Sequence, residues 1–252
     1  MMSKINIISF VCDWCSLQSA DFIGLTKIFF PRKISFIRVA CSGRVNPEIV
    51  TMAFKRGADG VIVMGCEKGA CNYRTGNFQA SRWIDAYRKV LKYSGLNPNR
   101  LKLHLESDTE IMQIYDQFYK DIEKLGAIGT EINKAKQELK GIFDVIEMTL
   151  LNEDIKWLVG REWTLVTVEN SYYEIYNEKM FKKILEQRLK EEFLISRIAY
   201  LTKENPMTVT EIAGKLGEKP EDVFRTIVEM GRKEKAMLVD FVNREPRYQT
   251  VR

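Results

Sequence analysis

All five cysteines of this 252-residue chain lie within its first 71 residues. They are Cys12, Cys15, Cys41, Cys66 and Cys71. Clustering of this kind has three usual causes, which are a disulfide framework, a metal or cluster site, and a thiol redox centre. Which of these causes applies determines whether the first half of the chain folds around a bound group and which chemistry it can carry out.

A disulfide framework is the least favoured of these causes. The chain starts with Met1 and an alternating segment rather than a secretory signal, and no apolar run approaches the ~18 residues of a membrane span. We therefore expect a cytoplasmic protein without a membrane partner, in which thiols stay reduced unless a metal or catalysis holds them. A bound metal or cluster is favoured over catalytic thiols and over inert buried cysteines.

Three of the cysteines follow short runs that are rich in β-branched residues. The runs are Ile5–Val11, Ile34–Ala40 and Val61–Met64, and the cysteines that follow them are Cys12, Cys41 and Cys66. Runs that are apolar on both faces are typical of a parallel sheet covered by helices. Because the carboxyl ends of parallel strands lie along one edge, where ligands bind, three distant segments would deliver sulfur to one place.

The segments between these runs predict helices and one more strand. Asn46-Pro47-Glu48 is a helix start, with Asn as the N-cap and Pro at the first helical position, and Gly57 ends that helix. Further helices are predicted at Gln79–Tyr93 and Asp108–Leu125, and a fourth strand at Leu101–Leu105. Residues 1–125 are thus expected to form an α/β domain with an open, mostly parallel sheet flanked by helices.

The second half of the chain has a different composition. Residues 126–192 are charged and predict a mostly helical connector. Its elements are a helix at Glu131–Leu150, a short strand at Trp163–Val168 and a long helix that runs from Lys179 to Leu201.

Residues 193–252 predict a domain that resembles a winged helix. Thr208-Val209-Thr210-Glu211 is a capping box that opens its second helix, and residues 235–239 and 248–251 are the strands of a wing. The third helix opens with Glu218, Glu221 and Asp222, which would face DNA phosphates unfavourably. A net charge of +5 over 252 residues is also no strong nucleic-acid footprint. Protein docking or dimerisation is therefore favoured over DNA binding for this domain.

The cysteine motifs and their surroundings resemble a known family. The segments CDWCS, RVACSGRV and KRGADGVIVMGCEKGACNYRTGN are similar to those of the delta, iron–sulfur subunit of methyl-viologen-reducing hydrogenase, over roughly residues 3–126. The resemblance implies a 2Fe–2S cluster in a subunit without catalytic chemistry of its own. It also implies electron transfer from a hydrogenase, a formate dehydrogenase or a similar donor to the flavin-containing A subunit of heterodisulfide reductase, where electron bifurcation occurs.

The chain departs from this family at two positions. Val11 stands where the family often has a further cysteine, and Glu67 stands where it often has a histidine. Five thiols remain for a cluster that needs four ligands. Cys12 with Cys15 and Cys66 with Cys71 could each chelate one iron, which leaves Cys41 as the spare. The opposite choice, with Cys41 bound and Cys15 free, stays open.

Two alternatives to this interpretation follow from the residues alone. Four thiolates suit a structural zinc as well as an iron–sulfur cluster, and only the family resemblance favours iron. The second alternative concerns function, because a cysteine domain joined to a winged helix is also the arrangement of a redox- or metal-sensing transcriptional regulator. The electron-transfer subunit is favoured because the motif match lies in the cysteine half.

Overall fold

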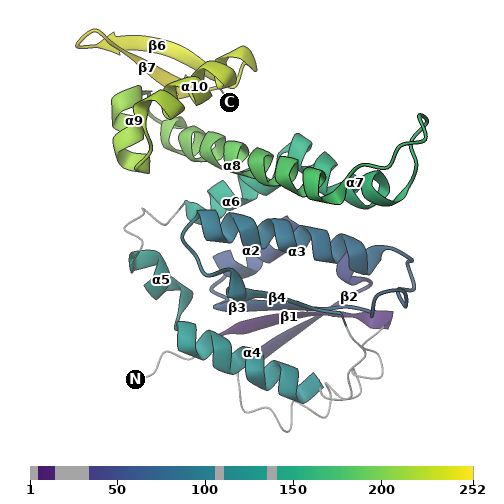
Figure 1. Ribbon diagram of the computed structural model, residues 1–252. Helices are drawn as coiled ribbons and strands as arrows, with labels where there is room; N and C mark the ends of the chain where they lie inside the picture. The colour runs from purple at the N-terminus through teal and green to yellow at the C-terminus, as the bar shows by residue number, and fades with distance from the viewer. Residues whose placement is uncertain (1–4, 15–33, 106–110, 135–140, 252) are drawn as a thin grey trace.

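The computed structural model describes residues 5–14, 34–105, 111–134 and 141–251 (Figure 1). Its centre is a four-stranded parallel sheet in the order β2-β1-β3-β4. The strands are β1 (Ile7–Cys12), β2 (Ile34–Val39), β3 (Gly60–Met64) and β4 (Leu101–His104). The chain passes from β1 to one neighbour and then returns to the other side, so the order reverses between β1 and β3. The expected α/β architecture with a parallel sheet is confirmed.

Helices cover both faces of this sheet. The helices α2 (Pro47–Lys55) and α3 (Gly76–Tyr93) lie on one face, and α4 (Ile111–Leu125) lies on the other (Figure 1). Alternate residues of β1 and β3 supply the two cores, because successive side chains of a strand point to opposite faces. Ile7 and Val11 pack with Phe118 of α4, whereas Phe10 belongs to the core beneath α2 and α3.

The helix starts show how local sequence sets the ends of these elements. The Asn46 side chain accepts a hydrogen bond from the backbone N–H of Ile49 at 3.0 Å, which confirms the predicted N-cap of α2. The helix α3 begins at Gly76, three residues before the predicted start at Gln79. Gly76 therefore lies in the first turn of a helix rather than in a loop.

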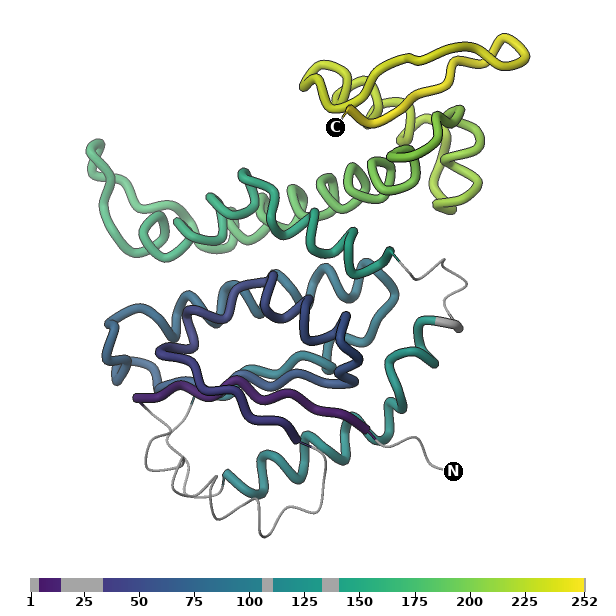
Figure 2. Tube along the Cα trace, turned by 180° about the vertical axis from the view of Figure 1, so that it is seen from behind, coloured from purple at the N-terminus to yellow at the C-terminus, as the bar shows by residue number. Residues whose placement is uncertain are grey.

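A third layer packs over α2 and α3 (Figure 2). It consists of α6 (Ile142–Leu151), α7 (Glu153–Thr167) and α8 (Glu178–Thr202). The smaller elements elsewhere in the chain are α5 (Ile128–Lys134) and the 3-10 turns η1 (Ser42–Arg44) and η2 (Pro98–Arg100). Phe143 of α6 stacks on Phe54 of α2 with ring centroids 5.5 Å apart. The residues expected to form a connector thus share one hydrophobic core with the α/β part, and the division of the chain into three domains stays a prediction.

Two predictions for the connector need comment. The predicted strand at Trp163–Val168 is wrong, because these residues belong to α7 up to Thr167, and Val168 is the C-cap. The helix predicted over Glu131–Leu150 appears as α5 and α6, and residues 135–140 between them lie outside the described residues.

The carboxy-terminal part contains a three-stranded antiparallel sheet and two further helices. These elements are β5 (Met207–Thr208), α9 (Val209–Leu216), α10 (Pro220–Arg232), β6 (Ala236–Val242) and β7 (Glu245–Thr250), with the strand order β5-β7-β6. The predicted capping box of Thr208 and Glu211 is present. The expected domain start at 193 falls inside α8, and the assignment as a winged helix stays a prediction. Within the described ranges, no helix combines the length and the apolar character needed to cross a bilayer.

The contact between α6 and α2 generates the first testable prediction. Phe143→Ala should lower the free energy of unfolding by about 3–5 kcal/mol, because it removes a buried ring that stacks on Phe54. The control is Met148→Ala on the same helix, where the side chain is exposed and the change should stay within about 0.5 kcal/mol. Urea unfolding measures both. A cost below about 1 kcal/mol for Phe143→Ala would show that the third layer does not share the core.

Candidate functional site

Three strand ends and one loop bring four cysteines together. Cys12 ends β1, whereas Cys41 and Cys66 each follow the last residue of their strand by two positions. With Cys71 from the loop before α3 they form one buried cluster, each exposing 8% or less of its surface. Because β1 lies between β2 and β3, the sulfurs converge at the point where the strand order reverses, as expected for a ligand site of an open parallel sheet. Cys15 lies outside the described residues.

The spacing of one sulfur pair is close to that of two ligands on a common metal ion. Cys12 Sγ and Cys66 Sγ are 3.9 Å apart. Two thiolates at ~2.3 Å from a tetrahedral ion are separated by ~3.8 Å. The fold therefore brings the sulfur of Cys12 close to that of Cys66, which follows the neighbouring strand β3. The spacing along the sequence had instead suggested Cys15 as the residue that shares an iron with Cys12.

The second pair is Cys41 with Cys71. Both sulfurs lie against the same backbone position, because a Cβ added to Gly76 would stand 2.3 Å from Cys41 Sγ and 3.3 Å from Cys71 Sγ. Burial raises the pKa of the Cys41 thiol, and the nearby Cys71 and Cys12 raise it further. The backbone N–H of Gly43 donates to Cys41 Sγ at 3.4 Å and acts in the opposite direction. Four thiolates in this space would thus need a cation between them.

Glycines make the close approach of these segments possible. A Cβ on Gly43 would stand 2.6 Å from the carbonyl oxygen of Gly76, and one on Gly65 would stand 2.6 Å from the Ser42 hydroxyl. The turn η1, which Cys41 precedes, is therefore packed directly against the end of β3 and the start of α3. Any side chain at these positions would push the Cys41 turn away from the other sulfurs.

Asn77 is a positioning residue that the sequence did not single out. Its side chain is fully buried, and its amide nitrogen donates to the carbonyl oxygens of Cys66 at 3.2 Å and Glu67 at 2.7 Å. It thereby ties the start of α3 to the loop that carries Cys66. The signal for it was local, since an Asn just before the start of a predicted helix often bonds nearby backbone.

The four buried thiols have the donor chemistry that an iron–sulfur cluster requires. Each iron of a 2Fe–2S cluster needs two protein thiolates, and a structural zinc needs four ligands around one centre, so four thiolates match the ligand count of either group. The Ser42 hydroxyl is also buried without a hydrogen-bond partner among the described residues. A buried hydroxyl next to Cys41 could donate to sulfur of a bound group.

The two departures from the family pattern lie outside the sulfur cluster. Val11 is buried in the core beneath α4 and so takes part in packing. Glu67 is exposed, and its backbone carbonyl is the acceptor for Asn77. Two exposed aromatic residues stand at the rim, since the Trp14 indole N–H donates to the Tyr73 hydroxyl at 3.2 Å. Each follows a cluster cysteine, Cys12 or Cys71, by two positions.

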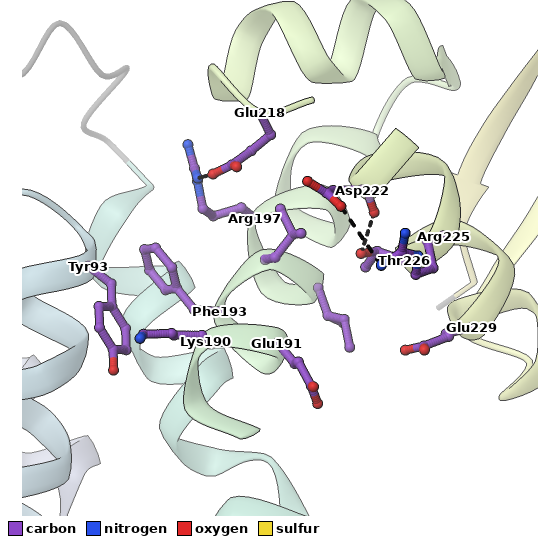
Figure 3. A pocket seen from close by; sticks show the side chains of 12 residues that line it. Tyr93, Lys190, Glu191, Phe193, Arg197, Glu218, Asp222, Arg225, Thr226 and Glu229 are labelled. Carbon is purple, nitrogen blue, oxygen red and sulfur yellow. Dashed lines mark hydrogen bonds and ion pairs between the residues drawn. The ribbon is translucent and has the colours of Figure 1, made fainter. Parts of the chain in front are cut away.

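A pocket of about 510 Å³ lies away from the cysteines, where α8 meets α10 next to Tyr93 (Figure 3). Two pairs of its charged residues form ion pairs across or along it, Arg197 with Glu218 and Arg225 with Asp222. Arg197 bonds to Glu218 at 2.8 Å, and Thr226 donates to the backbone oxygen of Asp222 at 2.8 Å. These contacts identify the pocket as a polar joint between the third layer and the carboxy-terminal helices.

Comparison with known proteins identifies the family. A family model described as methyl-viologen-reducing hydrogenase, delta subunit, matches residues 7–126. The iron-sulfur D subunit of the F420-non-reducing hydrogenase from Archaeoglobus profundus is 40% identical over 124 residues, which are 48% of this chain and 90% of that relative. An iron-sulfur D subunit of the same type from Methanococcus voltae is 35% identical over 135 residues, 52% of this chain and 93% of the relative. The chain belongs to the family of these hydrogenase delta subunits.

A second group of relatives is much longer. The A subunit of the ferredoxin:CoB-CoM heterodisulfide reductase from Methanosarcina mazei is 40% identical over 131 residues, which are 51% of this chain. The chain spans only 16% of the length of that relative. In this relative, a segment similar to about half of the present chain is therefore part of the same polypeptide as the rest of the A subunit.

The close packing at Gly76 generates the second prediction. Gly76→Ala should lower the free energy of unfolding by about 1–3 kcal/mol and speed the reaction of Cys41 with a maleimide, because the added methyl group forces that sulfur out of its place. Gly160→Ala, inside α7 with open space around it, is the control and should be neutral or stabilising by up to ~1 kcal/mol. Equal effects of the two substitutions would contradict the arrangement.

Proposed function

We propose that this chain is an electron-transfer subunit that holds a 2Fe–2S cluster on Cys12, Cys41, Cys66 and Cys71. The observation that carries the proposal is the burial of these four thiols together at the carboxyl edge of a parallel sheet. When bound, such a cluster takes up and releases single electrons. The chain supplies the thiolates, the close-packed glycine backbone and the exclusion of water that tune the potential of such a site.

The arrangement of the four described sulfurs supports Cys41 as a ligand. Cys41 belongs to the buried cluster, and its turn is packed against glycines at which any added Cβ would clash with the turn or with its sulfur. The pairs would be Cys12 with Cys66 and Cys41 with Cys71, each drawn from two different segments. The cluster would then fasten strand ends and loop to one another, and its binding energy would contribute to folding.

The names of the relatives support the choice of partners. We propose that electrons arrive from a hydrogenase or a formate dehydrogenase-type donor and leave to a flavin-containing protein that resembles the heterodisulfide reductase A subunit. The name of the Archaeoglobus profundus relative refers to a hydrogenase, and the Methanosarcina mazei relative carries a similar segment within the A subunit itself. A segment that is covalently part of the A subunit in one organism is well suited to dock on the A subunit in another.

The alternative function is that of a transcriptional regulator, and the side chains on the surface of α10 do not favour DNA binding. This helix would enter the major groove of DNA in a winged helix. It opens with Glu221 and Asp222, and Phe224 and Val228 on it are exposed. Acidic and apolar side chains suit a protein contact better than a phosphate backbone.

The ligand set generates the third prediction. The anaerobically purified chain should contain about two irons and two acid-labile sulfides, with thiolate-to-iron absorption in the visible range. Cys41→Ser should lose most of the iron, because it removes one of two thiolates from an iron. Cys15→Ser is the matched control and should keep the iron.

Two results would count against this assignment. One zinc per chain without labile sulfide would refute the cluster. Loss of iron in Cys15→Ser with retention in Cys41→Ser would instead support Cys15 as a ligand and Cys41 as the spare.

The alternative function as a DNA-binding regulator generates the fourth prediction. The full-length chain should bind duplex DNA only weakly, with Kd values of ~10⁻⁶ M or higher at about 150 mM salt and no preference for sequence. Mobility shifts over a range of salt concentrations measure this. Specific binding at ~10⁻⁸ M or tighter would support the regulator.

A further inference from the structure

The connection between α7 and α8 lies at the same end of the molecule as the cysteine cluster. We call residues 168–177 the tyrosine loop, because its sequence is Val-Glu-Asn-Ser-Tyr-Tyr-Glu-Ile-Tyr-Asn. Figures 1 and 2 both place it at the end where the carboxyl ends of β1 and β3 lie, and the hairpin of β6 and β7 at the other end. The loop lies beyond the residues that the family model matches, so membership of the family assigns it no role.

This loop is held in one shape by its own hydrogen bonds. The Asn170 side-chain oxygen accepts from the backbone N–H groups of Tyr172 at 2.8 Å and Glu174 at 3.1 Å. The Asn170 backbone N–H donates to the Glu174 carbonyl oxygen at 3.0 Å, and its carbonyl oxygen accepts from the Tyr173 N–H at 3.0 Å. A loop that is already ordered loses less conformational entropy when it binds a partner than a flexible loop does.

Within the loop, the backbone of Tyr173 is strained. Its φ is +61°, in the left-handed region that a bulky aromatic residue rarely adopts. Its side chain is 86% exposed and that of Tyr172 is 81% exposed, so neither ring contributes to a core that would offset the strain. Strained residues of this kind are concentrated at functional and binding sites. Tyrosine in particular is enriched in protein interfaces.

The loop is fixed relative to the helix that packs on the cysteines. The Tyr176 N–H donates to the Leu165 carbonyl oxygen at 3.0 Å, which ties the loop back to α7. Arg82 of α3 lies 3.6 Å from Glu162 of α7, and both side chains are largely buried. The same helix α3 begins at Gly76, against the sulfurs of Cys41 and Cys71. A partner seated on the loop would therefore have a defined position relative to the cluster site.

We propose that the tyrosine loop is a docking surface for the flavoprotein that takes electrons from the cysteine site, a protein of the heterodisulfide reductase A-subunit type. This inference rests on the proposed function. The sulfurs are buried, so the redox group of any protein partner must approach the sheet edge where Trp14 and Tyr73 are exposed. The tyrosine loop lies at the same end of the molecule. It contains aromatic rings and the acidic residues Glu169 and Glu174, and it contains no basic residue. The matching surface on the partner has an apolar centre and a basic rim.

Full-length variants with their cluster in place test this surface. The probe is a purified flavoprotein of the heterodisulfide reductase A-subunit type, and its Kd is measured by biolayer interferometry. Tyr172→Ser/Tyr173→Ser should weaken binding at least about tenfold, because exposed tyrosines at interface centres are frequent hot spots. The matched control is Met237→Ser/Phe241→Ser on β6, which replaces two exposed apolar residues at the other end of the molecule and should change the Kd by less than about threefold.

A single substitution separates binding from folding. Tyr173→Gly should leave the melting temperature equal or higher, because glycine adopts a φ of +61° without strain, and should still weaken binding about fivefold or more. A merely structural Tyr173 would show no such loss of affinity. Visible absorption of each variant checks that the cluster is retained.

Each outcome has a distinct meaning. If the A subunit binds wild type and the loop variants within about twofold of each other, the docking surface is wrong and the proposed function stands. If wild type with its cluster neither binds the A subunit nor reduces it, the proposed function fails as well. Should the double variant not fold, hydrogen exchange of the wild-type complex decides, because residues 168–177 must gain protection and residues 236–242 must not. Protection confined to the hairpin would overturn the proposal.

Discussion

The parallel pairing of β1 with both β2 and β3 is the constraint on which the site depends. Parallel neighbours end at the same edge, so a cysteine after each strand reaches the same small volume although the residues are far apart in sequence. The helix α3 then closes this volume from above, and its first residue Gly76 leaves space for two sulfurs. Because the backbone segments touch there, Gly43, Gly65 and Gly76 leave no room for a side chain of their own.

Much of this architecture could be predicted from residue patterns. The apolar β-branched runs indicated the strands, and the signals at Asn46, Thr208 and Glu211 indicated helix starts that the structure confirms. Such signals are reliable because they act within a few residues of one another. The convergence of the strand-end cysteines could also be predicted, since it follows from the topology of a parallel sheet alone.

Other features depend on contacts that no local pattern contains. Trp163 to Val168 is rich in residues that favour strands, yet α7 extends to Thr167. Val159 and Glu162 of this helix are buried, and Glu162 lies against Arg82, so tertiary packing overrides the local preference. Arg100 is fully buried and donates hydrogen bonds to Glu131 and to the Asp59 carbonyl oxygen. Neither its burial nor these partners could be predicted from the sequence. The close approach of Gly43 to Gly76 is a third case, since two distant glycines carry no mark of their contact.

Two groups of exposed apolar residues lie at opposite ends of the molecule. Tyr172 and Tyr173 stand at the cysteine end, whereas Met237, Leu238 and Phe241 stand on the hairpin at the other. The strand β6 is also the edge of its sheet, so its outer backbone groups are open to a further strand. A partner that covers the hairpin leaves the cysteine edge exposed, because the layer of α6, α7 and α8 lies between them. The hairpin and the cysteine edge are thus two separate surfaces on opposite sides of the helical layer.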